Sequence, residues 1–351
     1  MIKDIIVTVP KLTLPGGVSA FWNALLPEFE KMESIRFRAL EIGGHGKNVF
    51  GPLIDLWNLR KETNAPSDLI ILNPSLGSRS FFRDAFFAKY LIRKNKPFVI
   101  FFHGWNLQFQ ERIDKKYISF FQTTLGKAKK IFVLSNDFKN KIIEWGYKGE
   151  VIVLTTTVNA DLFNTPDKVQ KNSNDKLTIL FLSRLIKEKG IYETISAFEK
   201  LIADKINVRL VIAGNGQELE NLKTLVADND DIILTGHVEG QEKVDLYKNC
   251  DVYCLPSYSE GLPTSVLEAM AFGKSIITTP VGGLRSFFQD NEMGFFVETK
   301  NPIDLEDKLR SLLLDEDLRN RIGNFNYKYA HQHIMSDKVA QKMFNELEPF
   351  L

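Results

Sequence analysis

The sequence predicts an α/β protein of two Rossmann-like, doubly wound parallel-sheet domains that face each other across a cleft. Apolar, β-branched runs alternate with segments of helical spacing along the chain, which is typical of parallel sheets covered by helices on both faces. The alternation breaks once, at about residues 160–176, and then restarts. At 351 residues the chain is also too long for one ordinary hydrophobic core.

The first half contains strand patterns separated by helical patterns. The expected strands are IKDIIVTV, IRFRALEI, SDLIILN, KPFVIFF, KKIFVLS and EVIVL. Helical spacing is clear in VSAFWNALLPEFEKM and FFRDAFFAKYLIRK. We therefore predict an N-terminal Rossmann-like domain over residues 1–163.

A polar segment at 164–176, which carries Pro166, is the predicted linker. A second domain is predicted over 177–330, with the strands LTILFLS, NVRLVIAG, DIILTG, DVYCLP and KSIITTP. Residues 331–351 are predicted to form a C-terminal helix that packs back toward the first domain. Because ligands of such sheets bind beyond the carboxyl ends of the strands, the cleft is the expected site.

Composition is that of an ordinary globular protein, with 44% hydrophobic and 25% charged residues. Cys250 and Cys254 lie in an apolar run without a nearby histidine, so reduced core thiols are expected rather than zinc or a disulfide. The N-terminus resembles a strand more than a signal peptide. No apolar run approaches the roughly 18–20 residues that span a bilayer. We expect a cytoplasmic protein, with peripheral contact at the inner face of the cell membrane as an open alternative.

Charge is distributed unevenly along the chain. Net charge is +1 overall, but +8 over residues 1–163 and −7 over residues 164–351. Basic residues concentrate at 81–96, among aromatic residues, and in KAKK at 127–130. These segments indicate either docking on an anionic leaflet or a sheet-covering helix with a solvated basic face. No nucleic-acid partner is expected.

The segment PSYSEGLPTSVLEAMAFGK, at 256–274, carries the most chemical information. Pro263 is expected at the first position of a helix that Gly273 ends. The free N–H groups at the start of that helix favour phosphate. Glu260 before the helix and Glu268 on its second turn could contact a sugar and a ribose on either side of a diphosphate. An isolated pair of glutamates at this spacing is more often a surface coincidence, and only the surrounding sequence favours a site.

SRLIKEKG, at 183–190, follows a strand and supplies a second set of charges. The Arg184 guanidinium and the Lys189 ammonium complement each other around a diphosphate, although an isolated pair is usually a solvated loop. Gly214 opens a G-x-G that is equally consistent with a tight turn. The G-x-G-x-x-G fingerprint is absent from the sequence, which argues against a nicotinamide enzyme.

Two motifs of the first half also follow predicted strands. Gly16 and Gly17 would let the backbone approach a ligand at the start of the first helix, or would form a plain turn. His103 follows KPFVIFF and is expected at the sheet edge that faces the cleft.

Taken together, these motifs resemble family four of the retaining glycosyltransferases, which have the GT-B architecture. The resemblance is strong over about 177–297 and includes a Glu, seven residues, Glu signature at Glu260 and Glu268. The first half resembles the family more loosely, through PGG, HGWN and VLSNDFKNKIIEWGY. The sequence departs from the family before the linker, where TTTVNADLF replaces the usual Asn-Gly pair.

The resemblance implies a role for each motif. Arg184 and Lys189 would hold the donor diphosphate, Glu268 the ribose and Glu260 the transferred sugar. The expected catalytic residues are Arg184, Lys189, Glu260 and His103. The expected donor-binding residues are Gly16, Gly17, Arg184, Lys189, Gly214, Val238, Glu260, Gly261, Leu262, Thr264, Ser265 and Glu268.

The implied reaction moves a sugar from a UDP- or GDP-linked donor to a glycan or lipid-linked acceptor on the first domain, in surface polysaccharide biosynthesis. Cofactors and metal ions are not expected, since an Asp-x-Asp motif is missing from the expected place. A nucleotide-sugar epimerase of the same fold and a non-catalytic sugar- or lipid-binding subunit are the alternatives. A same-face attack, in which the leaving phosphate takes the acceptor's proton, is the preferred mechanism, and a transient nucleophile from the first domain is its alternative.

Overall fold

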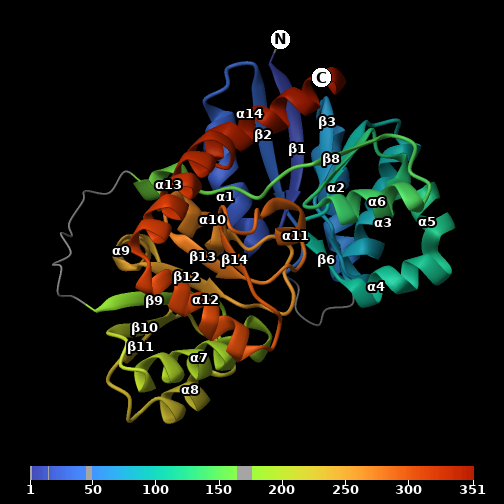
Figure 1. Ribbon diagram of the computed structural model, residues 1–351. Helices are drawn as coiled ribbons and strands as arrows, with labels where there is room; N and C mark the ends of the chain where they lie inside the picture. Colours follow the sequence, from blue (N-terminus) through green and yellow to red (C-terminus); the bar gives the residue numbers. More distant parts are fainter. Residues whose placement is uncertain (1, 15, 45–49, 164–175) are drawn as a thin grey trace. The chain divides into compact units, whose positions relative to one another are not determined.

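The computed structural model describes residues 2–14, 16–44, 50–163 and 176–351. The chain forms two compact units (Figure 1): unit 1 contains Met1–Thr157 and Ser336–Leu351, and unit 2 contains Val158–Met335. The second unit thus begins at Val158, a few residues before the boundary predicted at 163. The predicted linker at 164–176 lies outside the described residues, except for Lys176.

Unit 1 is built on a parallel sheet in the order β2-β1-β3-β5-β7-β8. Its strands are β1 (Lys3–Val9), β2 (Ile35–Glu41), β3 (Leu69–Leu72), β5 (Phe98–Phe101), β7 (Lys130–Val133) and β8 (Glu150–Val153). The inner strands β3, β5 and β7 are buried at every position, as expected of strands covered on both faces. The strand order reverses between β1 and β3, which gives the sheet a flavodoxin-like switch point.

Two short strands, β4 (Ser75–Leu76) and β6 (Gly104–Trp105), pair separately. The helices of unit 1 are α1 (Gly17–Glu30), α2 (Gly51–Asn64), α3 (Ser78–Arg93), α4 (Leu107–Arg112), α5 (Ile118–Thr123), α6 (Asn136–Glu144) and α14 (Ser336–Leu347). Polar side chains cap the starts of α4 and α6; at α6 the Ser135 hydroxyl accepts a hydrogen bond from the Phe138 N–H at 3.2 Å.

The last helix of the chain belongs to the first unit. α14 packs against α1, and the Ser336 hydroxyl donates to Glu28 at 3.1 Å. Lys130 of β7 is buried and lies 2.5 Å from Glu346 of α14. This lysine therefore contributes to internal packing rather than to the basic surface predicted at 127–130.

Unit 2 has a parallel sheet in the order β11-β10-β9-β12-β13-β14. The strands are β9 (Leu177–Leu182), β10 (Val208–Ala213), β11 (Ile232–Gly236), β12 (Val252–Leu255), β13 (Ser275–Thr278) and β14 (Gly294–Phe296). Numbered within the unit this is 3-2-1-4-5-6, the Rossmann order, with its switch point between β9 and β12.

The helices of unit 2 are α7 (Ile191–Ala203), α8 (Leu219–Leu225), α9 (Gly240–Asn249), α10 (Thr264–Ala271), α11 (Leu284–Phe287), α12 (Pro302–Leu314) and α13 (Glu316–His333). Cys250 and Cys254 are buried in this unit. The predicted pair of Rossmann-like α/β domains is confirmed. The sequence prediction missed β14, a three-residue edge strand.

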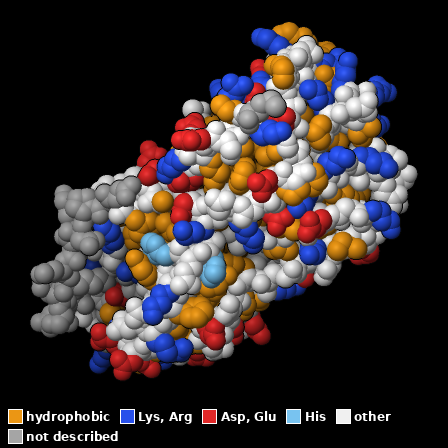
Figure 2. Space-filling view, turned by 90° about the horizontal axis from the view of Figure 1, so that it is seen from above, with side chains coloured by type: hydrophobic (Ala, Val, Ile, Leu, Met, Phe, Trp, Pro, Cys, Tyr) orange, Lys and Arg blue, Asp and Glu red, His pale blue; other side chains and the backbone are white. Residues whose placement is uncertain are grey.

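Within the described part of the chain, no helix combines the length and the apolar character that crossing a bilayer requires. Hydrophobic side chains are visible among charged ones on the face drawn in Figure 2, which is normal for a protein surface.

Candidate active site

Unit 2 brings two charged loops together where its strand order reverses. β9 and β12 are hydrogen-bonded neighbours in the sheet, although β10 and β11 separate them along the chain. Residues 183–190 follow β9, and residues 256–263 follow β12. Because ligands of doubly wound sheets bind at this reversal, the two loops form the candidate site.

An ion pair joins the two loops. The Nζ atom of Lys189 lies 2.5 Å from Oε1 of Glu260, and each side chain is only 10% exposed. Loss of solvent makes such a pair costly unless its geometry is good, and removal of one partner leaves the other charge uncompensated. Each side chain is therefore held in place by the other.

Backbone contacts fix the relative position of these loops. The carbonyl of Glu188 accepts hydrogen bonds from the Tyr258 N–H at 2.8 Å and from the Ser257 hydroxyl at 3.1 Å. Gly190, which follows Lys189, has φ of 76°, and a β-carbon there would lie 2.2 Å from the Pro256 carbonyl oxygen. Only glycine meets both requirements.

Arg184 is placed differently from Lys189. It lies in the same loop but is exposed, and its side chain forms no hydrogen bond or ion pair with any described residue. Its guanidinium therefore keeps all of its donors for an anion from solvent.

The helix α10 starts beside these charges. Pro263 is extended and precedes the helix, which begins at Thr264, so the prediction that Pro263 occupies the first helical position is wrong by one residue. Leu262 is buried, whereas Gly261, Thr264 and Ser265 are partly exposed. The free N–H groups of the first turn are a positive end suited to phosphate.

The Tyr253 hydroxyl positions that first turn. It lies 2.7 Å from the Ser265 hydroxyl and 2.9 Å from the carbonyl of Leu182, the last residue of β9. Burial raises the pKa of Tyr253 well above its usual value, so the phenol stays neutral and can donate. The start of α10 is thereby tied to the carboxyl end of β9.

Glu268, on the second turn of α10, is buried and has two partners that the sequence analysis missed. Lys243 lies 2.8 Å from its Oε1, and the Tyr247 hydroxyl donates to its Oε2 at 2.8 Å. Both come from α9, with the four-residue spacing of one helix face. Burial and the nearby Glu268 charge raise the pKa of Tyr247, which keeps its hydroxyl as a donor.

Gly282, in the VGGL turn after β13, supports the other side of the Glu260 loop. It has φ of 55°, and a β-carbon there would lie 1.9 Å from the Glu260 carbonyl oxygen and 2.6 Å from that of Gly261. The neighbouring Gly283 N–H donates to the Gly261 carbonyl. The turn therefore requires glycine in order to hold the backbone of residues 260–261.

The G-x-G of the sequence packs against the arginine loop. Gly214 has φ of 140°, and a β-carbon there would lie 1.8 Å from the Ser183 carbonyl oxygen. The carbonyl of Asn215 accepts from the Leu185 N–H at 2.9 Å. Gly214 therefore shapes the Arg184 loop. Val238, predicted near the nucleotide base, is 7% exposed and lies between β11 and α9.

His103 belongs to unit 1 and follows β5, at the carboxyl ends of its sheet. Its Nε2 is hydrogen-bonded to Oδ1 of Asn73 at 3.1 Å, and the Asn73 amide donates to the Thr8 carbonyl at 2.6 Å. Its ring lies 3.8 Å from the Phe101 ring and 4.8 Å from the Phe21 ring. Burial lowers the pKa of His103 to about 3, so the imidazole is neutral at neutral pH.

Gly16 and Gly17 begin α1, at the same end of the unit 1 sheet. A β-carbon at Gly17 would meet no described atom within 4 Å, so the space beside the helix start is open. Among the described residues, no group of three or more His, Cys, Asp and Glu side chains could hold a metal ion.

In unit 2 the structure therefore brings Arg184, Lys189, Glu260 and the start of α10 to one switch point, and Glu268 lies one helical turn further along. His103, Gly16 and Gly17 lie at the corresponding end of the sheet in unit 1. Sequence spacing could not reveal Lys243 and Tyr247, because their partner Glu268 is on another helix.

Comparison with known families and proteins supports this description. The family model of the glycosyl transferases group 1 matches residues 164–329. An uncharacterized glycosyltransferase of Methanocaldococcus jannaschii is 27% identical over 74% of this chain and 71% of its own length. The capsular polysaccharide biosynthesis glycosyltransferase CapM of Staphylococcus aureus is 26% identical over 61% of this chain and 57% of its own length.

Solved structures share the fold over almost the whole chain. Sucrose-phosphate synthase from Thermosynechococcus elongatus superposes with a TM-score of 0.77 at 16% identity, covering 99% of this chain and 98% of that one. Anabaena HepE in complex with UDP-glucose gives a TM-score of 0.73 at 14% identity and covers 99% of both chains. These likenesses establish the fold.

Replacing Gly282 with alanine should disrupt the site. The substitution adds a left-handed strain of about 1 kcal/mol and also a collision with the Glu260 carbonyl. Gly240→Ala is the matched control, since Gly240 has φ of 56° but open space around its β-carbon position. In urea unfolding, Gly282→Ala should lose clearly more stability than Gly240→Ala. Equal losses would show that the close approach at residue 282 is unimportant.

The neutral state of His103 predicts a pH dependence of stability. Its folded pKa of about 3 lies below the unfolded value of about 6.5, so acid protonates the unfolded chain first. Stability from this residue is complete above pH 6.5 and should fall progressively as the pH drops from 6.5 toward 3. Urea unfolding of wild type and His103→Gln across this range should show a shallower slope for the variant. Identical slopes would contradict the assignment.

Proposed function

Because the family model of the glycosyl transferases group 1 matches residues 164–329, we propose that the chain is a retaining, metal-independent glycosyltransferase that uses a nucleotide-sugar donor. The observation that carries the proposal is the ion pair of Lys189 and Glu260 at the switch point of the unit 2 sheet, with the exposed Arg184 on the same loop as Lys189. There, two cations and a helix start can bind a diphosphate while a carboxylate remains for sugar hydroxyls.

The groups of unit 2 would bind the donor one after another. Arg184 is exposed and has no partner among the described residues, so it can bind a phosphate first. The diphosphate then competes with Glu260 for Lys189, and the released Glu260 carboxylate accepts hydrogen bonds from the sugar. Glu268, fixed by Lys243 and Tyr247, accepts from the ribose hydroxyls.

The reaction breaks the bond between the anomeric carbon and a phosphate oxygen. Negative charge grows on the leaving diphosphate, and preorganised cations and N–H groups stabilise it. In the same-face mechanism that we favour, the acceptor oxygen bonds to the anomeric carbon as the phosphate departs. The acceptor's proton passes to the leaving phosphate oxygen, so no enzyme carboxylate becomes a nucleophile.

We assign charge neutralisation to Arg184, Lys189 and the α10 helix start rather than to a divalent ion, and we propose no resident cofactor. From unit 1 we assign His103 to the transferred sugar, as a neutral imidazole. Gly16 and Gly17 are assigned to close backbone approach to the diphosphate.

For the acceptor we propose a glycan or a lipid-linked glycan of surface polysaccharide biosynthesis. Support comes from the relative CapM, whose name assigns it to capsular polysaccharide biosynthesis. A lipid-linked acceptor lies in a bilayer, so we also propose that the protein contacts a membrane peripherally.

Donor binding can be tested by thermal and urea unfolding with UDP, GDP, ADP and their sugar conjugates, each with and without EDTA. A donor nucleotide at 100 times its dissociation constant should stabilise the chain by about 2.7 kcal/mol, equally in EDTA. Arg184→Ala should weaken this binding roughly ten- to hundredfold, because it removes charge-assisted hydrogen bonds.

Lys187→Ala, which removes an exposed cation from the same loop, is the matched control and should bind the nucleotide as wild type does. Nucleotide binding that requires a metal would contradict metal independence. No response to any nucleotide would favour a non-catalytic subunit, and conversion of the donor sugar without an acceptor would favour an epimerase.

Retention makes a separate prediction. Once the donor is identified, proton NMR of the product glycoside should show the same anomeric configuration as the donor. An inverted product would refute the same-face mechanism while leaving the donor assignment intact.

A further inference from the structure

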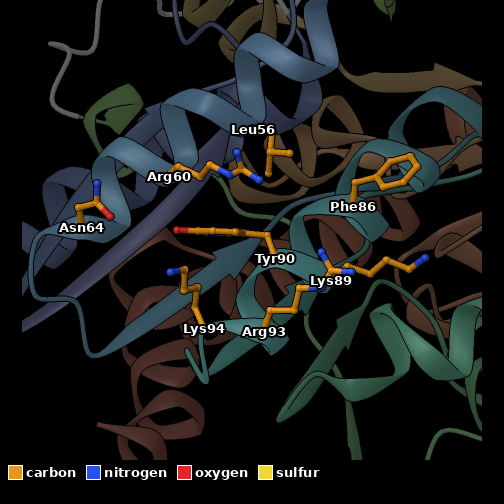
Figure 3. Close-up of a pocket in the computed structure, with 8 residues that line it drawn as sticks. All are labelled: Leu56, Arg60, Asn64, Phe86, Lys89, Tyr90, Arg93 and Lys94. Atoms are coloured by element: carbon orange, nitrogen blue, oxygen red, sulfur yellow. The ribbon is translucent and has the colours of Figure 1, made fainter.

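Unit 1 has a groove between α2 and α3. It lies beside the C-terminal halves of both helices, away from the carboxyl ends of the sheet. Its volume is about 650 Å³, and its lining includes Arg60 on α2 with Lys89, Arg93 and Lys94 at the end of α3. Figure 3 shows the Tyr90 ring between the Arg60 and Lys94 side chains. The groove is therefore aromatic at its centre and cationic around it.

No carboxylate of the described residues pairs with the cations of this groove. Arg60 lies 5.3 Å from the Tyr90 ring and Lys89 lies 4.9 Å from the Phe120 ring, and neither is paired with a carboxylate among the described residues. By contrast, Arg38 of β2 is paired with both Asp4 and Glu62. The residues lining the groove include no acidic side chain, so it attracts an anion.

Beside the groove, α2 turns hydrophobic side chains toward solvent. The buried residues of α2 form one narrow stripe, Gly51, Asp55, Leu59 and Thr63. Its exposed surface carries Leu53 at 62%, Ile54 at 40% and Trp57 at 62% exposure, and α3 adds Phe86 at 52%. Ordinary surface helices carry polar residues at such positions, so these side chains indicate a surface that another apolar phase covers.

Aromatic and aliphatic side chains next to unpaired cations match the headgroup region of a bilayer. Trp and Phe favour that depth, and Lys and Arg bind its phosphates. A nucleic acid would use the cations and the rings but would leave Leu53 and Ile54 uncovered. The combination therefore favours lipid over nucleic acid.

We propose that the face formed by α2 and α3 docks on an anionic membrane, with a lipid phosphate in the groove and Trp57 inserted beside it. This inference rests on the proposed function for its biological sense, because a lipid-linked acceptor requires such contact, but it depends on different residues and can fail separately.

Co-sedimentation of the full chain with vesicles tests the charges. The protein should bind phosphatidylcholine vesicles containing 30% phosphatidylglycerol (about a third anionic lipid, enough for electrostatic binding) far better than pure phosphatidylcholine. The double variant Arg60→Gln/Arg93→Gln should bind the anionic vesicles roughly thirtyfold more weakly. Lys148→Gln/Lys342→Gln, which neutralises two exposed cations elsewhere in unit 1, is the matched control and should lose much less affinity. Equal losses in the two variants, or no preference for anionic vesicles, would overturn the proposal.

Tryptophan fluorescence tests the inserted side chain. Trp57 is the tryptophan of the α2–α3 face and is 62% exposed. Trp22 and Trp145 are fully buried, and the partly exposed Trp105 stacks on Phe138 and Trp145, so a blue shift on vesicle addition should come from Trp57. Trp57→Phe should abolish the shift while the protein still sediments with vesicles. A shift that persists in this variant would place the membrane contact elsewhere.

The thermal-shift assay with nucleotides separates this proposal from the proposed function. Arg60→Gln/Arg93→Gln should bind the donor nucleotide as wild type does, which also shows that it is folded. Nucleotide binding without vesicle binding would overturn the docking surface alone. Vesicle binding without nucleotide binding would overturn the proposed function and leave the docking surface in place.

Discussion

The reversal of strand order in unit 2 is the constraint on which the rest of the site depends. The chain leaves β9 toward β10 and leaves β12 toward β13, so the loops after these neighbouring strands diverge, and ligands of doubly wound sheets bind at such a divergence. The same reversal brings Lys189 within 2.5 Å of Glu260, although 71 residues separate them along the chain. A buried ion pair of this kind holds both side chains in position, but it is not covalent and can exchange one partner for another. It therefore suits the proposed site, where an incoming diphosphate would replace Glu260 beside Lys189.

Close backbone approach provides the rigidity around that pair. Gly190, Gly214 and Gly282 each have a positive φ. At each of them a neighbouring carbonyl oxygen occupies the space that a β-carbon would otherwise fill. The three contacts join the loops after β9, β10, β12 and β13 into one block. Side-chain hydrogen bonds from Tyr253 to the start of α10 and from Tyr247 to Glu268 extend the block to the two flanking helices.

The strands and the two-domain plan could be predicted from sequence because buried parallel strands form continuous apolar runs, as in LIIL of β3 and LTILFL of β9. The site loops could be located because they follow such strands. What escaped prediction depends on pairing between distant segments: the Lys189–Glu260 ion pair, the support of Glu268 by Lys243, and the placement of Lys130 against Glu346. The offset at Pro263 arose because proline fits both the cap and the first helical position.

The placement of α14 in unit 1 has a consequence for biosynthesis. The α1 surface that α14 covers is made early, but its cover is translated only after Val158–Met335. At ribosomal rates of about 5–20 residues per second, that delay is on the order of 10–40 s. Unit 1, whose two segments flank unit 2 in the sequence, can therefore be completed only after unit 2 has been translated. During this interval the surface of α1 is open to chaperones or to premature association. The first-made half of the chain is the last to reach its native state.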